Sequence, residues 1–172
     1  GQFIDMRDMR DLAERMVSNA TIFTDNLVIN EHAWQIVVAV HQPGEIVRFS
    51  LINGLIVPKG EHFKLIEKYI LEDVTPKVDA IVRKIQGARF TVSSINECFS
   101  IFVRATIPGA TFGGQIKDSL ILNQGTKSKG ISFTPGFIAG ISSRIEEIVK
   151  EIIVPKLVSK LDTKKRERCT YD

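Results

Sequence analysis

The stretch ATFGGQIKDSL at residues 110–120 contains the side chains whose types and spacing could do chemistry. Gly113 and Gly114 allow the backbone to adopt positive φ angles or to approach a ligand closely. Gln115 and Lys117 then offer an amide and an ammonium group in one loop, a combination that can bind an anion. A Gly-Gly-Gln-x-Lys pattern is short, however, and an ordinary solvated turn has a similar composition. The rest of the chain must decide between these two interpretations.

The remaining reactive residue types form no recognisable catalytic or metal-binding pattern. The three histidines, His32, His41 and His62, lack metal-ligand spacing, and we interpret them as surface or capping residues. Cys98 and Cys169 have no CxxC spacing, so we expect a buried and an exposed thiol and no metal site. No GxSxG, Walker A or GxGxxG motif is present. The sequence therefore predicts no catalytic residue within this chain.

Length and composition indicate one ordinary domain with a real core. The 172 residues are 44% hydrophobic and 25% charged, which argues against disorder. No apolar run reaches the roughly 20 residues of a membrane-spanning helix, so we expect a soluble, intracellular protein without a membrane partner. The net charge of +3 permits a nucleic-acid partner without requiring one. Because the chain lacks an initiating methionine, we expect it to be part of a longer protein.

The first half of the chain reads as a helix followed by strands. Apolar residues at three-and-four spacing predict a helix at 5–17. The segments 21–30, 33–42 and 46–54 are rich in β-branched and aromatic residues, with a QPGE turn at 42–45. These strands are predicted to form an antiparallel meander.

The second half is mostly helical. A helix begins after Gly60, and Thr75 and Pro76 are expected to start a second one; a single long helix kinked at Pro76 is the alternative. A short helix at 91–97 precedes a strand at 99–107. Isoleucines at 138, 141, 145, 148 and 152 predict a long helix over 137–161, which Pro155 should kink or break.

Two longer segments carry a family resemblance that covers nearly the whole chain. They are RFSLINGLIVPKGEHF at 48–63 and FVRATIPGATFGGQIKDSL at 102–120. In this order they resemble the transducer domain of a type IIA DNA topoisomerase of the eukaryotic and large-DNA-virus branch. Ile116 stands where the family usually has threonine, and Gly60 lacks its usual partner glycine. The matching residues are Ile52, Asn53, Lys59, Gly60, His62, Pro108, Phe112, Gln115 and Lys117.

The resemblance implies an α+β fold. The expected architecture is a mostly antiparallel four-stranded sheet with helices packed on one face, like domain 2 of ribosomal protein S5, and a long C-terminal helix. The transducer domain would span residues 1–136. Residues 137–172 would form the long helix and a basic tail that lead toward the cleavage core.

The resemblance also implies a function, in which an ATPase module outside this chain holds ATP and Mg²⁺. Gln115 and Lys117 would contact the γ-phosphate, and the domain would couple ATP binding and hydrolysis to DNA strand passage. Lys127 and Lys129 would face double-stranded DNA. The partners would be the neighbouring ATPase and cleavage modules and a second copy of the enzyme. The location would be the nucleus, or a cytoplasmic replication site for a viral protein.

Two alternatives remain at this point. The first is the corresponding domain of a mismatch-repair or chaperone ATPase of the same superfamily, although a lone lysine or arginine would be expected there in place of the Gln-x-Lys pair. The second is a stand-alone nucleic-acid-binding module that uses the lysines of GTKSKG and the basic run KKRER on phosphates.

Overall fold

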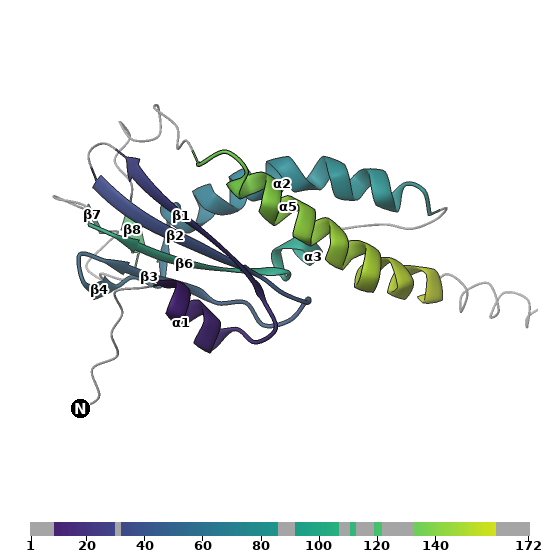
Figure 1. Ribbon diagram of the computed structural model, residues 1–172, viewed down its shortest axis with the longest axis horizontal. Coiled ribbons are helices and arrows are strands. Elements are labelled where there is room, and N and C mark those ends of the chain that lie inside the picture. The colour runs from purple at the N-terminus through teal and green to yellow at the C-terminus, as the bar shows by residue number, and fades with distance from the viewer. Residues whose placement is uncertain are drawn as a thin grey trace, which may run out of the picture.

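A mixed five-stranded sheet forms the centre of the molecule (Figure 1). The computed structural model describes residues 9–29, 32–85, 92–106, 111–112, 119–121 and 133–160. The strand order is β1-β2-β6-β3-β4, in which β3 and β6 are parallel and the other neighbours antiparallel. The strands are β1 (Thr21–Ile29), β2 (His32–Val40), β3 (Arg48–Ile52), β4 (Leu55–Ile56) and β6 (Phe99–Ala105).

The predicted antiparallel meander is wrong, because β6 lies between β2 and β3. The connection from β2 to β3 crosses the start of β6, where the amide of His41 donates to the carbonyl of Cys98 at 2.8 Å. At the other end of this connection, just before β3, the carbonyl of Val47 accepts a hydrogen bond of 2.9 Å from the amide of Ile101. All residues of β6 except Arg104 are buried, because its central place in the sheet covers both of its faces. Burial of β6 therefore outweighs pairing between strands that are adjacent in sequence.

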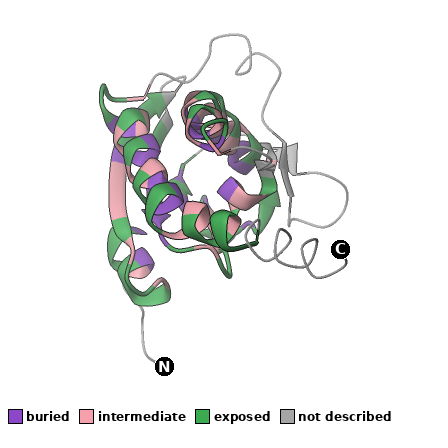
Figure 2. Ribbon diagram, turned by 90° about the vertical axis from the view of Figure 1, so that its right-hand side faces the viewer, coloured by how far each residue is buried: buried purple, intermediate pink, exposed green. Residues whose placement is uncertain are grey.

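Two long helices cover one face of the sheet, and a short helix covers part of the other. The long helices are α2 (Glu61–Val82) and α5 (Phe137–Ile148), and the short one is α1 (Met9–Met16). Figure 2 shows buried residues on the inner sides of the helices and exposed residues on their outer sides. The side chains of β2 alternate between these layers, with Trp34 and Ile36 toward the long helices and Val37 toward α1.

The expected α+β fold class is thus confirmed, with three differences in detail. The sheet is mixed, and β4 adds a fifth, two-residue strand after the turn at Asn53 and Gly54. Both turn residues have positive φ angles, 53° and 79°, as a tight hairpin turn requires. In addition, α1 packs on the face opposite the long helices. The short helix α3 (Val92–Asn96) precedes β6 as predicted.

Helix α2 runs through Pro76 without interruption, so the prediction of a second helix starting at Thr75 is wrong and the single-helix alternative is right. A proline inside a helix removes one backbone hydrogen bond. The core compensates for this loss, because one row of buried side chains continues across Pro76. The row consists of Ile66, Ile70, Val74, Val78 and Val82.

The helix that begins at Phe137 also continues past a proline. A π-helical turn, η1 (Val149–Ile153), follows α5, and α-helix resumes to residue 160. The amide of Val154 donates to the carbonyl of Val149, five residues back. The predicted disturbance at Pro155 is therefore a π turn that ends two residues before it. This turn keeps Ile153 and Leu157 in contact with the core.

Candidate functional site

A second, small sheet holds both ends of the segment that contains Gln115 and Lys117. Its strand order is β5-β8-β7, with β5 (Lys59–Gly60), β7 (Thr111–Phe112) and β8 (Ser119–Ile121). β7 and β8 are antiparallel, with Phe112 opposite Leu120. Residues 113–118 therefore connect two paired strands.

The predicted site residues themselves lie outside the described residues. This applies to Gln115 and Lys117, and equally to the two lysines predicted to face DNA, Lys127 and Lys129. Their roles stay predictions, and the structure supplies the frame around them.

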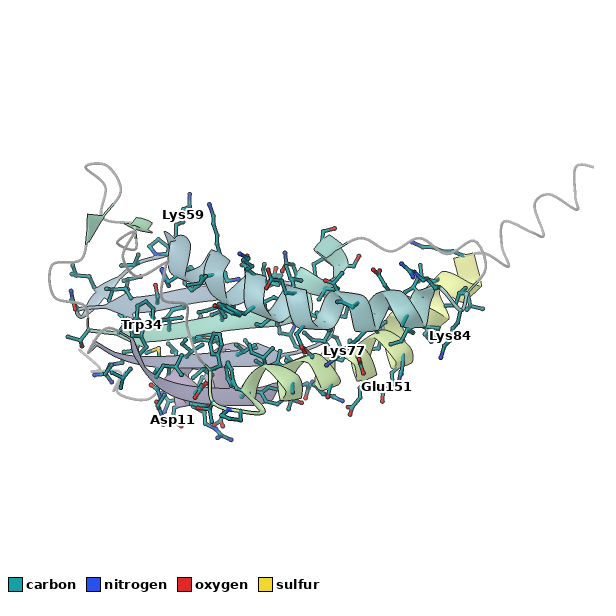
Figure 3. The ribbon with its side chains drawn as sticks, turned by 90° about the horizontal axis from the view of Figure 1, so that it is seen from above. Asp11, Trp34, Lys59, Lys77, Lys84 and Glu151 are labelled. Carbon is teal, nitrogen blue, oxygen red and sulfur yellow. The ribbon has the colours of Figure 1, made fainter. Side chains whose placement is uncertain are left out.

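The small sheet joins the main body at the start of α2. β5 pairs in parallel with β8, with Lys59 beside Ser119 and Gly60 beside Leu120, and α2 begins at the next residue. Lys59 is exposed and occupies the register next to the end of the 113–118 segment. Figure 3 shows Lys59 at this end of α2 and Lys84 at the opposite end. A displacement of β8 would therefore act directly on the first residues of α2.

His62, in the first turn of α2, is 1% exposed. Its ring nitrogen Nε2 lies 3.0 Å from the hydroxyl of Ser50 on β3, and that hydroxyl donates to the carbonyl of Val57. The ring of Phe63 lies 4.1 Å away and that of Trp34 6.4 Å away, measured between centroids. Burial lowers the pKa of His62 to about 4, so its imidazole is neutral at physiological pH.

His41 forms a similar pair on the other side of the sheet, with Ser100 of β6. The Ser100 hydroxyl lies 2.9 Å from His41 Nε2 and accepts a hydrogen bond from the amide of Val47 at 2.9 Å. His41 Nδ1 donates to the carbonyl of Gln42 at 2.7 Å. This network fixes the connection between β2 and β3.

The interpretation of the histidines as surface or capping residues is therefore wrong for His41 and His62, which are both buried. The side chain of His32 lies outside the described residues. His41 follows an apolar segment and His62 is one of the residues that carry the family resemblance, but neither signal reveals a serine partner on another strand. Cys98 is buried as predicted, and burial raises the pKa of its thiol to about 12, which makes it unreactive.

A carboxylate fixes the start of α5 against the sheet. Asp25 on β1 is 4% exposed and accepts a hydrogen bond of 2.7 Å from the amide of Thr134 and another from the hydroxyl of the same residue. These two hydrogen bonds hold the chain entering α5 against β1.

The ends of β1, β2 and β6 enclose a hollow of about 460 Å³, lined by Asn26, Val28, Trp34, Arg104 and Thr106 among others. Val28 is 77% exposed, and the buried Trp34 Nε1 has no hydrogen-bond partner among the described residues. Figure 3 shows Trp34 at the same end of the molecule as Lys59.

A second hollow, of about 480 Å³, lies between α2 and the start of α5. Asp73 lines it, and the pKa of its carboxyl is lowered by the Ser142 hydroxyl and by Lys77, whose ammonium lies 3.1 Å away. Because Lys77 already neutralises this carboxylate, the hollow is a poor cation site. Within the described ranges, no group of three or more potential ligands could hold a metal ion. In the same ranges, no helix is long and apolar enough to cross a membrane.

Solved structures of other proteins share the fold of this chain. The ATPase and transducer domains of DNA topoisomerase II from Balamuthia mandrillaris align with a TM-score of 0.62 and 17% identity, over 83% of this chain and 36% of that one. The ATPase region of Saccharomyces cerevisiae topoisomerase II aligns with a TM-score of 0.54 and 20% identity, over 80% of this chain and 35% of that one. The 43K ATPase domain of Thermus thermophilus gyrase B aligns with a TM-score of 0.62 and 10% identity, over 96% of this chain and 47% of that one. The chain thus has the fold found in these topoisomerase regions.

Sequence comparison narrows the resemblance to viral enzymes. DNA topoisomerase 2 of African swine fever virus, isolate Pig/Kenya/KEN-50/1950, is 27% identical over 144 residues, which is 80% of this chain. The enzyme of the Warthog/Namibia/Wart80/1980 isolate is 28% identical over 142 residues, which is 81% of this chain. The chain spans only about 12% of the length of these relatives. No family model matches. The resemblance inferred from the sequence is confirmed: the chain is similar in sequence to viral DNA topoisomerase 2 and has the fold of the ATPase regions of type II topoisomerases.

Proposed function

We propose that this chain is the transducer domain of an ATP-dependent type II DNA topoisomerase, which senses the γ-phosphate of ATP and couples its binding and hydrolysis to DNA strand passage. The observation that carries the proposal is the small sheet on either side of residues 113–118. β7 pairs with β8, and β8 pairs with the strand that leads directly into α2. The similarity to viral topoisomerases supports this assignment over a mismatch-repair or chaperone ATPase.

The chemistry of the proposed sensor is electrostatic. The Lys117 ammonium is a compact charge on a flexible stem, suited to bind a phosphate and release it after hydrolysis. Gln115 would add a neutral hydrogen bond. ATP and Mg²⁺ would be held mainly by the ATPase module outside this chain. The chain alone would therefore neither hydrolyse ATP nor cleave DNA.

The packing offers a route from the sensor to the rest of the enzyme. A displacement of β8 would move β5 and the start of α2, and α2 packs along α5. The helix that includes α5 would carry the movement toward the cleavage module, which begins beyond residues 137–172. Packed elements of this kind move as units between discrete arrangements.

DNA and a second subunit complete the proposed assembly. Lys127 and Lys129 would face the transported duplex and make phosphate contacts that do not depend on sequence. The intact enzyme would be a homodimer, acting in the nucleus or at a cytoplasmic replication site.

The test is substitution of the sensor in the intact parent enzyme. Lys117→Ala should lower ATP turnover at subsaturating ATP about 10- to 100-fold, because a charge-assisted contact of about 1.5–3 kcal/mol to the γ-phosphate is lost. Gln115→Ala should cause a smaller loss, since a neutral amide makes a weaker bond. Lys84→Ala, which removes the same charge at the opposite end of α2, is the matched control and should leave turnover unchanged.

Thermal unfolding of each variant shows whether the domain remains folded. We expect unchanged melting for Lys117→Ala, because surface substitutions usually change stability by no more than about 0.5 kcal/mol. Normal turnover combined with normal melting in this variant would contradict the proposed function.

A further inference from the structure

We infer that His62 is a positioning residue, which holds the small sheet in a fixed relation to the main sheet and thereby sets how many strand passages result from each ATP hydrolysed. This inference rests on the proposed function, because it concerns how a signal at the hairpin of β7 and β8 reaches the main body. His62 itself would touch neither nucleotide nor DNA.

Three elements meet at the His62 side chain. The imidazole belongs to α2, its partner Ser50 belongs to β3, and Ser50 in turn holds Val57 in the connection between β4 and β5. Val57 is bound twice, since its amide also donates to the Ser50 carbonyl at 2.9 Å. The side chain of Val57 is fully buried. His62 and Ser50 therefore fix this connection against the main sheet.

The fixed connection leads within two residues to the small sheet. Val57 is followed by Pro58 and then by Lys59 and Gly60 of β5, which pair with Ser119 and Leu120 of β8. β8 begins directly after the proposed sensor segment. The pairing of β8 with β5, the short covalent link from Lys59 back to Val57 and the hydrogen bonds of Val57 to Ser50 thus connect the hairpin to β3 of the main sheet, and His62 lies where this connection meets α2.

Proton positions define what His62 contributes. The Ser50 hydroxyl has one proton and donates it to the Val57 carbonyl, so it must accept from His62 Nε2–H. The other ring nitrogen, Nδ1, is then an acceptor, and it has no partner among the described residues. A buried polar atom without a partner is costly, and an apolar side chain would fill the same space without this cost. The hydrogen bond to Ser50 is what an apolar residue could not supply.

The experiment measures coupling in the intact parent enzyme, as strand passages per ATP hydrolysed. In His62→Leu this ratio should fall by at least about fivefold, the lower end of usual coupling between sites, while ATP turnover changes less. His62→Gln should restore the ratio to near the wild-type value, because its side-chain amide can donate to Ser50 from a similar distance along the chain. Ser50→Ala should lower the ratio as His62→Leu does, and the double variant should be no worse than either single one.

His41→Leu is the matched control. His41 is also a buried histidine bonded to a buried serine, Ser100, but its network fixes the connection between β2 and β3. This variant should melt at a lower temperature and keep the wild-type number of passages per ATP.

An equal effect of His41→Leu and His62→Leu on melting, with no effect of either on the ratio, would overturn the inference and leave His62 a purely structural role. If His62→Leu does not fold, Ser50→Ala replaces it in this comparison, because this variant removes only the hydroxyl that bonds His62. A normal number of strand passages per ATP in Ser50→Ala would then overturn the inference. Failure of the proposed function gives a different result, namely normal ATP turnover in Lys117→Ala.

Discussion

At the scale of single residues, burial controls the proton binding of His62. Its pKa is lowered from 6.5 to about 4 by desolvation, whereas the same imidazole in the unfolded chain titrates near 6.5. Below pH 6.5 the unfolded state therefore binds more protons than the folded state, and stability falls as the pH falls toward 4. The contribution of His62 is fully present above pH 6.5.

The lowered pKa of His62 predicts a pH-dependent difference in stability between the wild-type chain and His62→Gln, whose side chain cannot titrate in this range. Between pH 7 and pH 4 the wild type should lose, relative to the variant, unfolding free energy on the order of 3 kcal/mol. Urea unfolding at several pH values measures this difference, in which the effects of other titrating groups cancel. Parallel pH profiles of the two proteins would show that His62 does not titrate as a buried group.

At the scale of elements, the sequence was most informative where the apolar pattern was regular. The strands β1 and β2 and the helix from Phe137 lie close to their predicted positions. The place of β6 between β2 and β3 could not be read from local pattern, because strand order depends on which strand the long helices and α1 bury. The predicted helix start at Thr75 and Pro76 failed for a related reason. The local propensity of proline favours a break in the helix, but the packing of a continuous row of buried side chains overrides it.

Pro76 therefore remains a local cost within α2. Because it is exposed and lacks an amide proton, Pro76→Ala should restore a helical hydrogen bond without disturbing the core. We expect an increase in unfolding free energy of about 1–2 kcal/mol, since the helical gain is partly offset by the greater freedom of the unfolded chain. The shift in the midpoint of urea unfolding measures this increase, provided that the dependence of the unfolding free energy on urea concentration is the same in both proteins.

Pro135→Ala provides the comparison, because this exposed proline precedes α5 and interrupts no helix. It should lower stability by about 0.4–1 kcal/mol through the unfolded state alone. Destabilisation of similar size in both variants would mean that the backbone around Pro76 depends on the proline ring.

At the scale of the whole molecule, the family resemblance came from two motifs in the right order, and the fold and the viral relatives confirm it. The location of the site stays a prediction, since Gln115 and Lys117 lie outside the described residues; the structure shows only that the flanking strands β7 and β8 pair with each other beside the start of α2. The roles of Gln115 and Lys117 could not be derived from this chain alone, because the nucleotide they are proposed to contact would be bound by another module. The buried contacts of His62 could not be predicted either: His62 and its partner Ser50 both lie in the segment 48–63 that carries the resemblance, but the sequence does not reveal that β3 and α2 bring the two side chains together.

The most direct test of the central claim compares nucleotide affinities of the intact parent enzyme and its Lys117→Ala variant. If Lys117 contacts the γ-phosphate, the variant should bind a non-hydrolysable ATP analogue about 10- to 100-fold more weakly, because a charge-assisted contact is lost. Its affinity for ADP, which has no γ-phosphate, should remain that of the wild type. An equal loss of affinity for both nucleotides, or no loss for either, would contradict γ-phosphate sensing by this residue.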